Sequence, residues 1–315
     1  MKNNNIFNQI PEESKIKQIL KENLFGKFVY CPTCGSRSIK KYENRFFCKH
    51  CRKKFSLTSV CWLRCSKLDL RTIYLILWFY CNKLPINQTS LASGHSKVTI
   101  RNWFTKFRNN IPKEVCEDIR LSNTVVMDEC YRGGKKNGYS ILGAKEKGTK
   151  KVAIKLLKKN SVNRMDAIVF LSNYVTPKST LNTDGSKIYK TIENYYPVIH
   201  QNEIHSKFEF TLTSEIEGLW GNITNYIRRM YHHVTKEKIE EILYEYVSRQ
   251  NNAKMFENPT NFLENTLSKL PRILLHKRLK TIQNIMKNNN QNFTNKILIL
   301  NPELAKKQYI LVPSC

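Results

Sequence analysis

The stretch Thr124-Val-Val-Met-Asp128 decides the fold of the central part of the chain. Its β-branched and apolar residues predict a short strand that ends at Asp128. A second run of this kind, Thr180–Thr183, ends at Asp184. Strand and helix patterns alternate around both runs, which indicates a mixed α/β domain with a mixed sheet over residues 120–251. The predicted fold class of the chain is therefore α/β (mixed), with smaller modules on either side of this domain.

Hydrophobic periodicity predicts the remaining elements of the domain. Strands are expected at Asn137–Ala144, Val152–Leu157 and Val198–His200, and helices at Asp166–Val175, Ile188–Tyr195, Glu215–Met230 and Thr235–Ser248. After the domain, residues 252–315 are rich in Asn and Lys and predict a partly ordered basic appendage.

Four cysteines near the start of the chain have the spacing of a metal site. Cys31-Pro-Thr-Cys34 and Cys48-Lys-His-Cys51 form a C-x2-C…C-x2-C pattern, in which each pair offers two thiolates to one tetrahedral ion. The alternatives are a pair of disulfides or unrelated thiols, but nothing in the sequence suggests the oxidising compartment that disulfides need. The pattern predicts one structural Zn²⁺ in a zinc ribbon over residues 28–58. Cys61 and Cys65, one helical turn apart, are expected to be small buried residues.

Helices are expected before and after the ribbon. Within residues 1–27, Pro11–Leu24 has a single apolar face and ends before Gly26. After the ribbon, Ser66-Lys-Leu-Asp69 resembles a capping box that opens a helix running to about Cys81.

Residues 66–112 have the pattern of a helix-turn-helix. A short helix over Asn87–Ser93 is followed by a turn at Gly94-His95 and by Ser96 as the cap of a longer helix. The apolar residues of the longer helix recur at i, i+3, i+4 and i+7, which predicts one buried face: Ile100, Trp103, Phe104 and Phe107. A plain helical hairpin with a solvated polar face is the alternative. Because cationic and amide side chains reach phosphates and base edges, the polar side of the second helix predicts DNA contact. Its candidate residues are Lys97, Thr99, Arg101, Asn102 and Lys106.

Charge supports a nucleic-acid partner. The 315 residues contain 53 Lys and Arg against 25 Asp and Glu, a net charge of +28. Such an excess favours binding to a polyanion. The longest apolar run, Thr72–Cys81, is too short to span a membrane, and no signal peptide is visible, so we expect neither a membrane protein nor a secreted one. Lysines also dominate residues 135–159, which predicts contact of Lys145, Lys147, Lys150 and Lys151 with DNA phosphates.

Three carboxylates predict a two-metal site. Asp128 and Asp184 each follow a strand pattern at a sheet edge, and Glu217 lies on the flank of the helix that follows. Carboxylate oxygens suit Mg²⁺ or Mn²⁺, and two such ions can promote in-line displacement at phosphorus.

Each of these three residues also has a structural interpretation. Asp128 and Asp184-Gly185 could be turn residues, and Ser214-x-x-Glu217 matches a capping box. Glu215 is a rival third ligand. Glu129 should point to the opposite face of its strand from Asp128 and is therefore not included.

Several motifs, in this order along the chain, resemble those of Merlin-type DDE transposases of eukaryotes and their bacterial insertion-sequence relatives. The matching segments are Val125-Val-Met-Asp128-Glu129, Thr183-Asp-Gly-Ser-Lys-Ile-Tyr189, His205-Ser-Lys-Phe208, Ile216-Glu-Gly-Leu-Trp220, Tyr231-His-His-Val234 and Tyr244-Glu-Tyr-Val-Ser-Arg249. The resemblance extends from about Phe28 to Asn251, because an N-terminal zinc ribbon and helix-turn-helix also fit this family.

The resemblance implies a ribonuclease-H-like catalytic domain in which Asp128, Asp184 and Glu217 hold two Mg²⁺ or Mn²⁺ ions. It implies cut-and-paste transposition, in which water cleaves the element end and the freed 3′-hydroxyl attacks target DNA. The sequence departs from the family at Thr224, where relatives often carry Lys, and Arg228 is a further candidate for DNA contact. Relatives also often carry Asn or Gln near the position of Ser214, and some bacterial ones use Asn as the third metal ligand. The roles of His205, His232 and His233 stay open, with substrate contact as the candidate.

The sequence thus predicts a DNA transposase that acts on double-stranded transposon ends and target DNA. A domesticated copy that only binds DNA, and a nuclease that cuts without joining, are the alternatives. Synapsis of two ends implies a homodimer or larger assembly during the reaction. The protein would act in the nucleus of a eukaryote or in the nucleoid of a bacterium.

Overall fold

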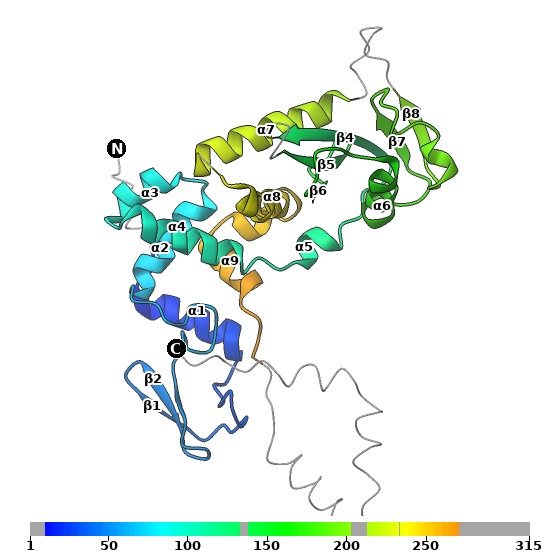
Figure 1. Ribbon diagram of the computed structural model, residues 1–315. Coiled ribbons are helices and arrows are strands. Elements are labelled where there is room, and N and C mark those ends of the chain that lie inside the picture. The colour runs from blue at the N-terminus through cyan, green and yellow to red at the C-terminus, as the bar shows by residue number, and fades with distance from the viewer. Residues whose placement is uncertain (1–9, 133–137, 203–212, 233, 271–315) are drawn as a thin grey trace, which may run out of the picture. The chain divides into compact units, whose positions relative to one another are not determined.

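The computed structural model of the protein describes residues 10–132, 138–202, 213–232 and 234–270 (Figure 1). The chain divides into two compact units: residues 1–71 with 267–315, and residues 72–266. The predicted module boundaries differ from this division, because the helix-turn-helix and the catalytic domain fall in one unit. None of the described helices combines the length and the apolar character that crossing a membrane requires.

The described residues of the first unit include helix α1 and a small sheet. Helix α1 spans Glu13–Phe25, close to the prediction, and ends at Gly26 with φ 66°. Strands β1 (Ile39–Tyr42), β2 (Arg45–Cys48) and β3 (Lys54–Phe55) pair antiparallel in the order β1-β2-β3, which confirms the expected ribbon. The rings of Phe25 and Phe55 pack at 6.1 Å, so the helix and the ribbon share an apolar core.

Two expectations for the segment after the ribbon are wrong. Cys65 is exposed and Cys61 is half-buried, so the pair does not form a buried apolar contact. Helix α2 spans Leu70–Cys81 and begins four residues after Ser66. The Ser66 hydroxyl accepts a 3.1 Å hydrogen bond from the backbone N–H of Leu68, which forms a local turn in place of a helix cap.

The second unit begins with the predicted helix pair. Helix α3 spans Ile86–Ser93 and α4 spans Lys97–Arg108, separated by a turn in which Gly94 adopts the left-handed conformation. The Ser96 side chain caps α4 by accepting a 3.2 Å hydrogen bond from Thr99 N–H. The apolar residues of α4 are buried as expected: Ile100, Trp103, Phe104 and Phe107.

Residues beyond 252 complete this helical part. The 3₁₀ helix η4 (Ala253–Phe256) and α9 (Pro259–Thr266) supply aromatic rings to it. Tyr80 of α2 stands at the centre, with the ring of Phe104 at 5.1 Å and that of Phe262 at 5.9 Å. The first part of the predicted appendage is thus folded, whereas residues 271–315 lie outside the described part of the chain.

A five-stranded mixed sheet forms the rest of the unit. Its strands are β4 (Thr124–Arg132), β5 (Tyr139–Glu146), β6 (Val152–Leu157), β7 (Thr180–Thr183) and β8 (Ile199–Asn202). They lie in the order β6-β5-β4-β7-β8, with β4, β5 and β6 antiparallel and β4, β7 and β8 parallel. A three-stranded meander extended by two parallel strands on the side of its first strand is the expected ribonuclease-H-like topology.

Helices cover both faces of this sheet (Figure 1). Helix α6 (Arg164–Tyr174) packs on one face, where Val125, Met127 and Phe170 share an apolar core. Helices α7 (Ser214–Tyr231) and α8 (Lys236–Asn251) lie on the other face. Short helix α5 (Glu114–Glu117) leads into β4. The helix predicted over 188–195 is reduced to the 3₁₀ turn η2 (Ile192–Asn194).

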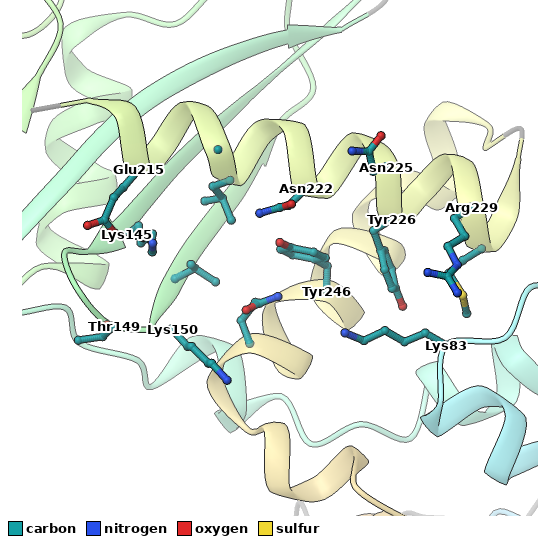
Figure 2. A pocket seen from close by; sticks show the side chains of 15 residues that line it. Lys83, Lys145, Thr149, Lys150, Glu215, Asn222, Asn225, Tyr226, Arg229 and Tyr246 are labelled. Carbon is teal, nitrogen blue, oxygen red and sulfur yellow. Dashed lines mark hydrogen bonds and ion pairs between the residues drawn. The ribbon is translucent and has the colours of Figure 1, made fainter. Parts of the chain in front are cut away.

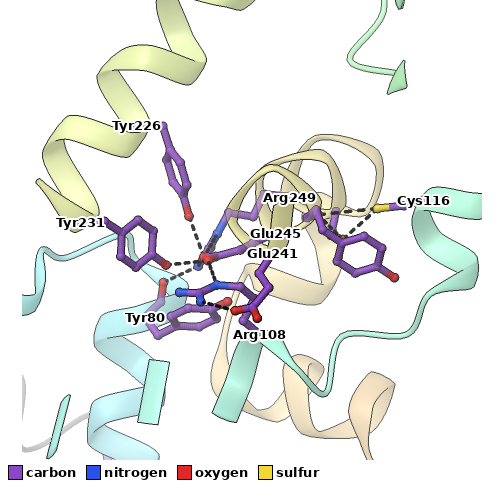
Figure 3. A network of polar contacts seen from close by, with 10 residues as sticks. Tyr80, Arg108, Cys116, Tyr226, Tyr231, Glu241, Glu245 and Arg249 are labelled. Atoms are coloured by element: carbon purple, nitrogen blue, oxygen red, sulfur yellow. Dashed lines mark hydrogen bonds and ion pairs between the residues drawn. The ribbon is translucent and has the colours of Figure 1, made fainter. Parts of the chain in front are cut away.

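A buried carboxylate links α4 of the helical part to α7 and α8, which cover the five-stranded sheet (Figure 3). Glu245 of α8 is fully buried and accepts hydrogen bonds from Arg108, Arg249 and the hydroxyls of two tyrosines, Tyr226 and Tyr231. Burial alone would raise the pKa of Glu245, but the two guanidinium groups and the two hydroxyls outweigh it and lower the pKa to about 2.

Arg249 extends this network to α2. Its guanidinium donates hydrogen bonds of 2.8 and 3.2 Å to the backbone carbonyls of Tyr80 and Cys81, which lie at the end of that helix. The guanidinium also lies over the rings of Tyr80 and Phe256. One buried anion therefore connects α2, α4, α7 and α8.

Candidate active site and metal centres

The two predicted aspartates meet where the sheet opens. Asp128 is the fifth residue of β4 and not a strand end, since β4 continues to Arg132. Strand β7 pairs with β4 only as far as Val126, and Asp184 directly follows β7. Beyond Val126 the β7 side of β4 is therefore open, and the two carboxylates approach each other across this open edge.

Glu129 joins the two aspartates, in contrast to the expectation. Carboxylate oxygens of Asp128, Glu129 and Asp184 all lie within 4.8 Å of one another. The side chain of Glu129 leaves the strand on the opposite face from Asp128, as alternation requires, and accepts a hydrogen bond from the Tyr189 hydroxyl. Because no strand flanks β4 at this point, its long side chain can reach the shared edge. Tyr189 is fully buried, so it holds the carboxylate in place.

The two candidates for the third ligand, Glu215 and Glu217, lie in different surroundings on α7. Glu215 is bound by Lys145 and by the backbone N–H of Gly148, and these contacts turn it away from the aspartates. Glu217 is exposed, and its charge raises the pKa of Asp128. The helix begins at Ser214, so Ser214 is not the residue that caps it. Glu217 lies outside the 4.8 Å group of Asp128, Glu129 and Asp184, so its assignment as the third ligand stays a prediction.

Trp220 anchors α7 to the catalytic strand. Its indole Nε1 donates a 2.9 Å hydrogen bond to Oδ2 of Asp128. The ring lies against Gly143, the residue that pairs with Asp128 across β4 and β5. A Cβ at position 143 would lie 2.9 Å from Cζ2 of Trp220 and closer still to Cη2. Glycine is thus required here by space and not by backbone conformation. Sequence reasoning missed this pair, although the Ile216–Trp220 motif included the tryptophan.

The protonation of these acids reflects burial and mutual repulsion. Burial raises the pKa of Asp128, and the charges of Asp184 and Glu217 add to this effect against the Trp220 hydrogen bond. Burial also raises the pKa of Glu129 to about 7, with Asp128 and Asp184 contributing in the same direction. Clustered carboxylates of this kind are relieved by a divalent cation, and oxygen ligands suit Mg²⁺ or Mn²⁺. The residues present therefore fit the predicted divalent metal site.

Arg132 contacts Thr224, the position at which relatives often carry Lys. Arg132 lies on β4 on the same face as Asp128, and its guanidinium donates a hydrogen bond to the hydroxyl of Thr224. Both residues line a cavity of about 330 Å³ together with Arg228 and His232. Two arginines therefore line the same cavity as Thr224, the position at which relatives often carry Lys.

The four ribbon cysteines converge as predicted. Sγ of Cys31 lies 3.5 Å from that of Cys51, and Sγ of Cys34 lies 3.6 Å from that of Cys48. All four are free thiols within one 4.8 Å group, so the disulfide alternative is wrong. Burial acts to raise the pKa of Cys48, but the backbone N–H groups of Cys51 and His50 outweigh it and lower the pKa to about 7. Four thiolates at these separations suit one tetrahedral Zn²⁺.

The loops after each cysteine pair explain this convergence. The backbone N–H of Gly35 bonds to the carbonyl of Cys31, and that of Arg52 bonds to the carbonyl of Cys48, each at 2.8–2.9 Å. Gly35 has φ 69° and Arg52 has φ 60°. Both positions need the left-handed region, which glycine reaches without cost and arginine reaches only in a well-held turn.

The residues predicted to contact DNA are mostly exposed. On α4, Lys97, Arg101 and Asn102 are exposed, whereas Thr99 and Lys106 are half-buried. Lys106 lies over the ring of Trp103, with its Nζ 4.9 Å from the ring centroid. These positions are compatible with the predicted helix-turn-helix, and the DNA contacts themselves stay predictions.

Two of the four lysines predicted to contact DNA phosphates are paired with carboxylates. Lys145 pairs with Glu215, and Lys151 lies 3.5 Å from Glu146. The other candidates in and near this region, Lys147, Lys150 and Arg228, are exposed. His232 is exposed at the end of α7, whereas His205 and His233 lie outside the described residues.

Comparison with known families matches two segments of the chain. Residues 120–251 match the ISXO2-like transposase domain, and residues 1–68 match the Dam-replacing family. No curated protein matches the chain.

Comparison with solved structures found distant similarities. The catalytic core domain of HTLV-2 integrase in complex with magnesium, in its dimeric form, is 15% identical over 39% of this chain and 85% of its own, with a TM-score of 0.28. A chain of the simian T-cell lymphotropic virus intasome in complex with PP2A regulatory subunit B56 gamma is 13% identical over 62% of this chain and 76% of its own, with a TM-score of 0.31. The match of residues 120–251, together with the acidic cluster on this sheet topology, identifies the segment as a DDE transposase domain of the ISXO2-like type.

Proposed function

We propose that the protein is a DNA transposase that binds transposon ends and carries out metal-dependent phosphodiester cleavage followed by strand transfer. The observation that carries the proposal is the convergence of Asp128 and Asp184 at the open edge of the sheet, inside a transposase domain. Glu217, whose charge acts on Asp128 from α7, is the third acidic group of this site.

The carboxylates would hold two Mg²⁺ or Mn²⁺ ions, which supply charge neutralisation at the reacting phosphate and activation of the attacking oxygen. In the first step, an oxygen of water bonds to phosphorus at the element end, and the 3′-oxygen leaves as a free 3′-hydroxyl. In the second step, this hydroxyl attacks a target phosphate and displaces the target 3′-oxygen. No covalent bond between protein and DNA is needed.

Side chains of this domain would orient the groups that react. Trp220 fixes Oδ2 of Asp128, so the second oxygen of that carboxylate stays directed along the sheet edge. Tyr189 restrains Glu129 in the same cluster. Arg132 and Arg228 line one cavity and provide cationic groups suited to the phosphates that flank the cut.

The other modules would recognise and hold the DNA. The exposed polar side of α4 suits contact with a major groove, and the net charge of +28 suits a duplex partner. The Cys31–Cys51 cluster would hold one structural Zn²⁺ and so fold the ribbon. Joining two element ends requires two active sites, so we expect at least a dimer during the reaction.

The test is cleavage and strand transfer on DNA that carries the ends flanking the gene, with Mg²⁺ or Mn²⁺ added. Wild type is compared with Asp128→Asn and with Asp166→Asn as a matched control, because Asp166 caps α6 away from the cluster. Products that need metal and disappear only in Asp128→Asn support the proposal. Tight DNA binding without products in any protein would instead indicate a copy that only binds DNA.

A further inference from the structure

Helix α7 has a second polar face, opposite the acidic cluster. A cavity of about 560 Å³ lies along this face, and we call it the α7 groove (Figure 2). Residues from the β5–β6 turn, α8 and the loop after α2 complete its walls. The argument below uses six of its lining residues: Lys83, Lys145, Lys150, Glu215, Asn222 and Arg229.

The groove and the active site use different sides of the same helix. Trp220 faces Asp128, whereas Asn222 lines the groove. Residues two positions apart lie about 200° apart around a helix of 3.6 residues per turn, so these side chains point in nearly opposite directions. A ligand in the groove is therefore separated by α7 from the phosphate that meets the carboxylates.

Among the described residues that line the groove, four cations face one carboxylate: Lys83, Lys145, Lys150 and Arg229 against Glu215. Glu215 is its one acidic lining residue and is already paired with Lys145. Within the described part of the chain, no carboxylate lies within 4 Å of Lys83, Lys150 or Arg229. Desolvation lowers the pKa of Lys83, and repulsion from Arg249, Arg229 and Lys150 lowers it further. Clustered cations that have no carboxylate partner favour the binding of an external anion.

The length of the groove indicates what kind of anion fits. Glu215 and Arg229 stand at its two ends, roughly 21 Å apart along the helix at 1.5 Å per residue. A single phosphate or a nucleotide would contact only part of this length. The phosphates of a DNA strand repeat about every 3.4 Å along the duplex axis, so a backbone lying in the groove can meet several cations at once. Asn222 at its middle can donate hydrogen bonds to phosphate oxygens.

We propose that the α7 groove binds the phosphodiester backbone of DNA at a site separate from the scissile phosphate. The inference rests on the proposed function in so far as DNA is the partner. It adds Lys83, Asn222 and Arg229 to the DNA-contacting residues, and it gives Lys150 a defined place. DNA held on both sides of α7 would fix the helix that carries Glu217.

The first test measures affinity for a labelled duplex without divalent metal, at salt concentrations from about 50 to 200 mM. The full chain is compared with a variant carrying Lys83→Gln, Lys150→Gln and Arg229→Gln. The control variant carries Lys155→Gln, Lys178→Gln and Lys238→Gln, which removes the same charge from exposed positions outside the groove. Each backbone contact contributes about 0.9 to the slope of log affinity against log salt, so we expect the groove variant, which removes three cations, to lose about 2.7 and the control less than about 1.

A second variant tests the groove without removing any of its cations. Asn222→Asp adds one negative charge at the middle of the groove and changes little else, because Asn222 is exposed. We expect it to weaken duplex binding about tenfold at low salt, whereas the same change at exposed Asn173 on α6 should leave binding within about twofold. Equal salt slopes for the two triple variants, together with unchanged binding by Asn222→Asp, would overturn the proposal.

Competition identifies the source of the phosphate. One outcome would contradict the proposal: ATP or inorganic phosphate binds to wild type but not to the groove variant, and both proteins bind the duplex equally. That result would assign the groove to a small anion. Because binding is measured without metal, the result is independent of catalysis. Cleavage that depends on Asp128 but is unaffected by the groove variants would retain the transposase function and remove only the groove.

Discussion

The indole Nε1 of Trp220 lies 2.9 Å from Oδ2 of Asp128, so a residue of α7 directly orients a carboxylate of the catalytic strand. The ring reaches this position because Gly143, opposite Asp128 on β5, has no side chain. The acid, the indole and the glycine form one unit, in which a change at any member displaces the carboxylate.

Removing the indole N–H should slow cleavage without affecting DNA binding. Trp220→Phe keeps an aromatic ring over Gly143 and loses only the hydrogen bond, for which we expect a rate about tenfold lower. Gly143→Ala pushes the ring away from the strand and should cost about a hundredfold or more. Gly221→Ala adds the same methyl group to open space on α7 and serves as the control. Wild-type cleavage by Gly143→Ala would contradict this account.

The two glutamates near Asp128 should differ in their effect on catalysis. Glu217→Gln removes a charge that acts on Asp128 from the exposed side of α7, and we expect metal-dependent cleavage to be lost. Glu129→Gln preserves an oxygen acceptor for Tyr189, so we expect the rate to fall only about tenfold. Single-turnover cleavage over a range of Mn²⁺ concentrations measures both. If Glu129→Gln alone abolishes cleavage, then the third ligand is Glu129 and not Glu217.

Zinc should be required by the ribbon and not by residues 72–266. The cysteine cluster fits one ion, so we expect one Zn²⁺ per chain, lost in Cys48→Ser or after treatment with a strong chelator. Cys65→Ser changes an exposed thiol outside the cluster and should retain the metal. Elemental analysis and limited proteolysis of residues 28–58 check this prediction, and zinc retained by Cys48→Ser would argue against it.

Glu245 should make the stability of the second unit sensitive to acid. Its pKa lies at about 2 in the folded protein against an ordinary value of 4.5, because two arginines and two tyrosines outweigh its burial. A lowered folded pKa means that the stabilisation is complete above pH 4.5 and is lost as the pH falls toward 2. Urea unfolding of wild type at a series of pH values measures this slope.

Two variants distinguish the contribution of Glu245 to stability from that of a surface acid. Glu245→Gln leaves two buried guanidinium groups without their anion and should lower the free energy of unfolding by about 3–5 kcal/mol at neutral pH. Glu240→Gln breaks only a surface pair with Lys158 and should cost less than about 1 kcal/mol. A wild-type stability that does not change between pH 5 and pH 3 would show that the network does not hold Glu245 ionised.

Local patterns in the sequence predicted much of this fold. The spacing of Ile100, Trp103 and Phe107 predicted both α4 and its buried face, since a helix repeats its faces every 3.6 residues. The cysteine spacing predicted the ribbon for a similar reason, because each knuckle is a local structure. Asp128 and Asp184 were also found, since each directly follows an apolar, β-type run of the sequence.

Relationships between distant elements could not be predicted in this way. Alternation correctly placed Glu129 and Asp128 on opposite faces, but it could not show that β7 ends beside Val126 and leaves an open edge that both can reach. Burial of Arg108 was not expected either, because its partner Glu245 lies far along the sequence. Such pairs arise from packing, and no single segment contains the signal.

The shared anion at Glu245 bears on how this chain can be divided or recombined. A fragment that begins at residue 120 would retain Glu245 and Arg249 but lose Arg108 and the helix-end carbonyls that bind Arg249. The matched transposase segment is therefore smaller than the unit that folds around it. Replacement of α2 or α4 without α8 would leave the buried charges of Glu245 and Arg249 without some of their partners, so these three helices have to be exchanged together.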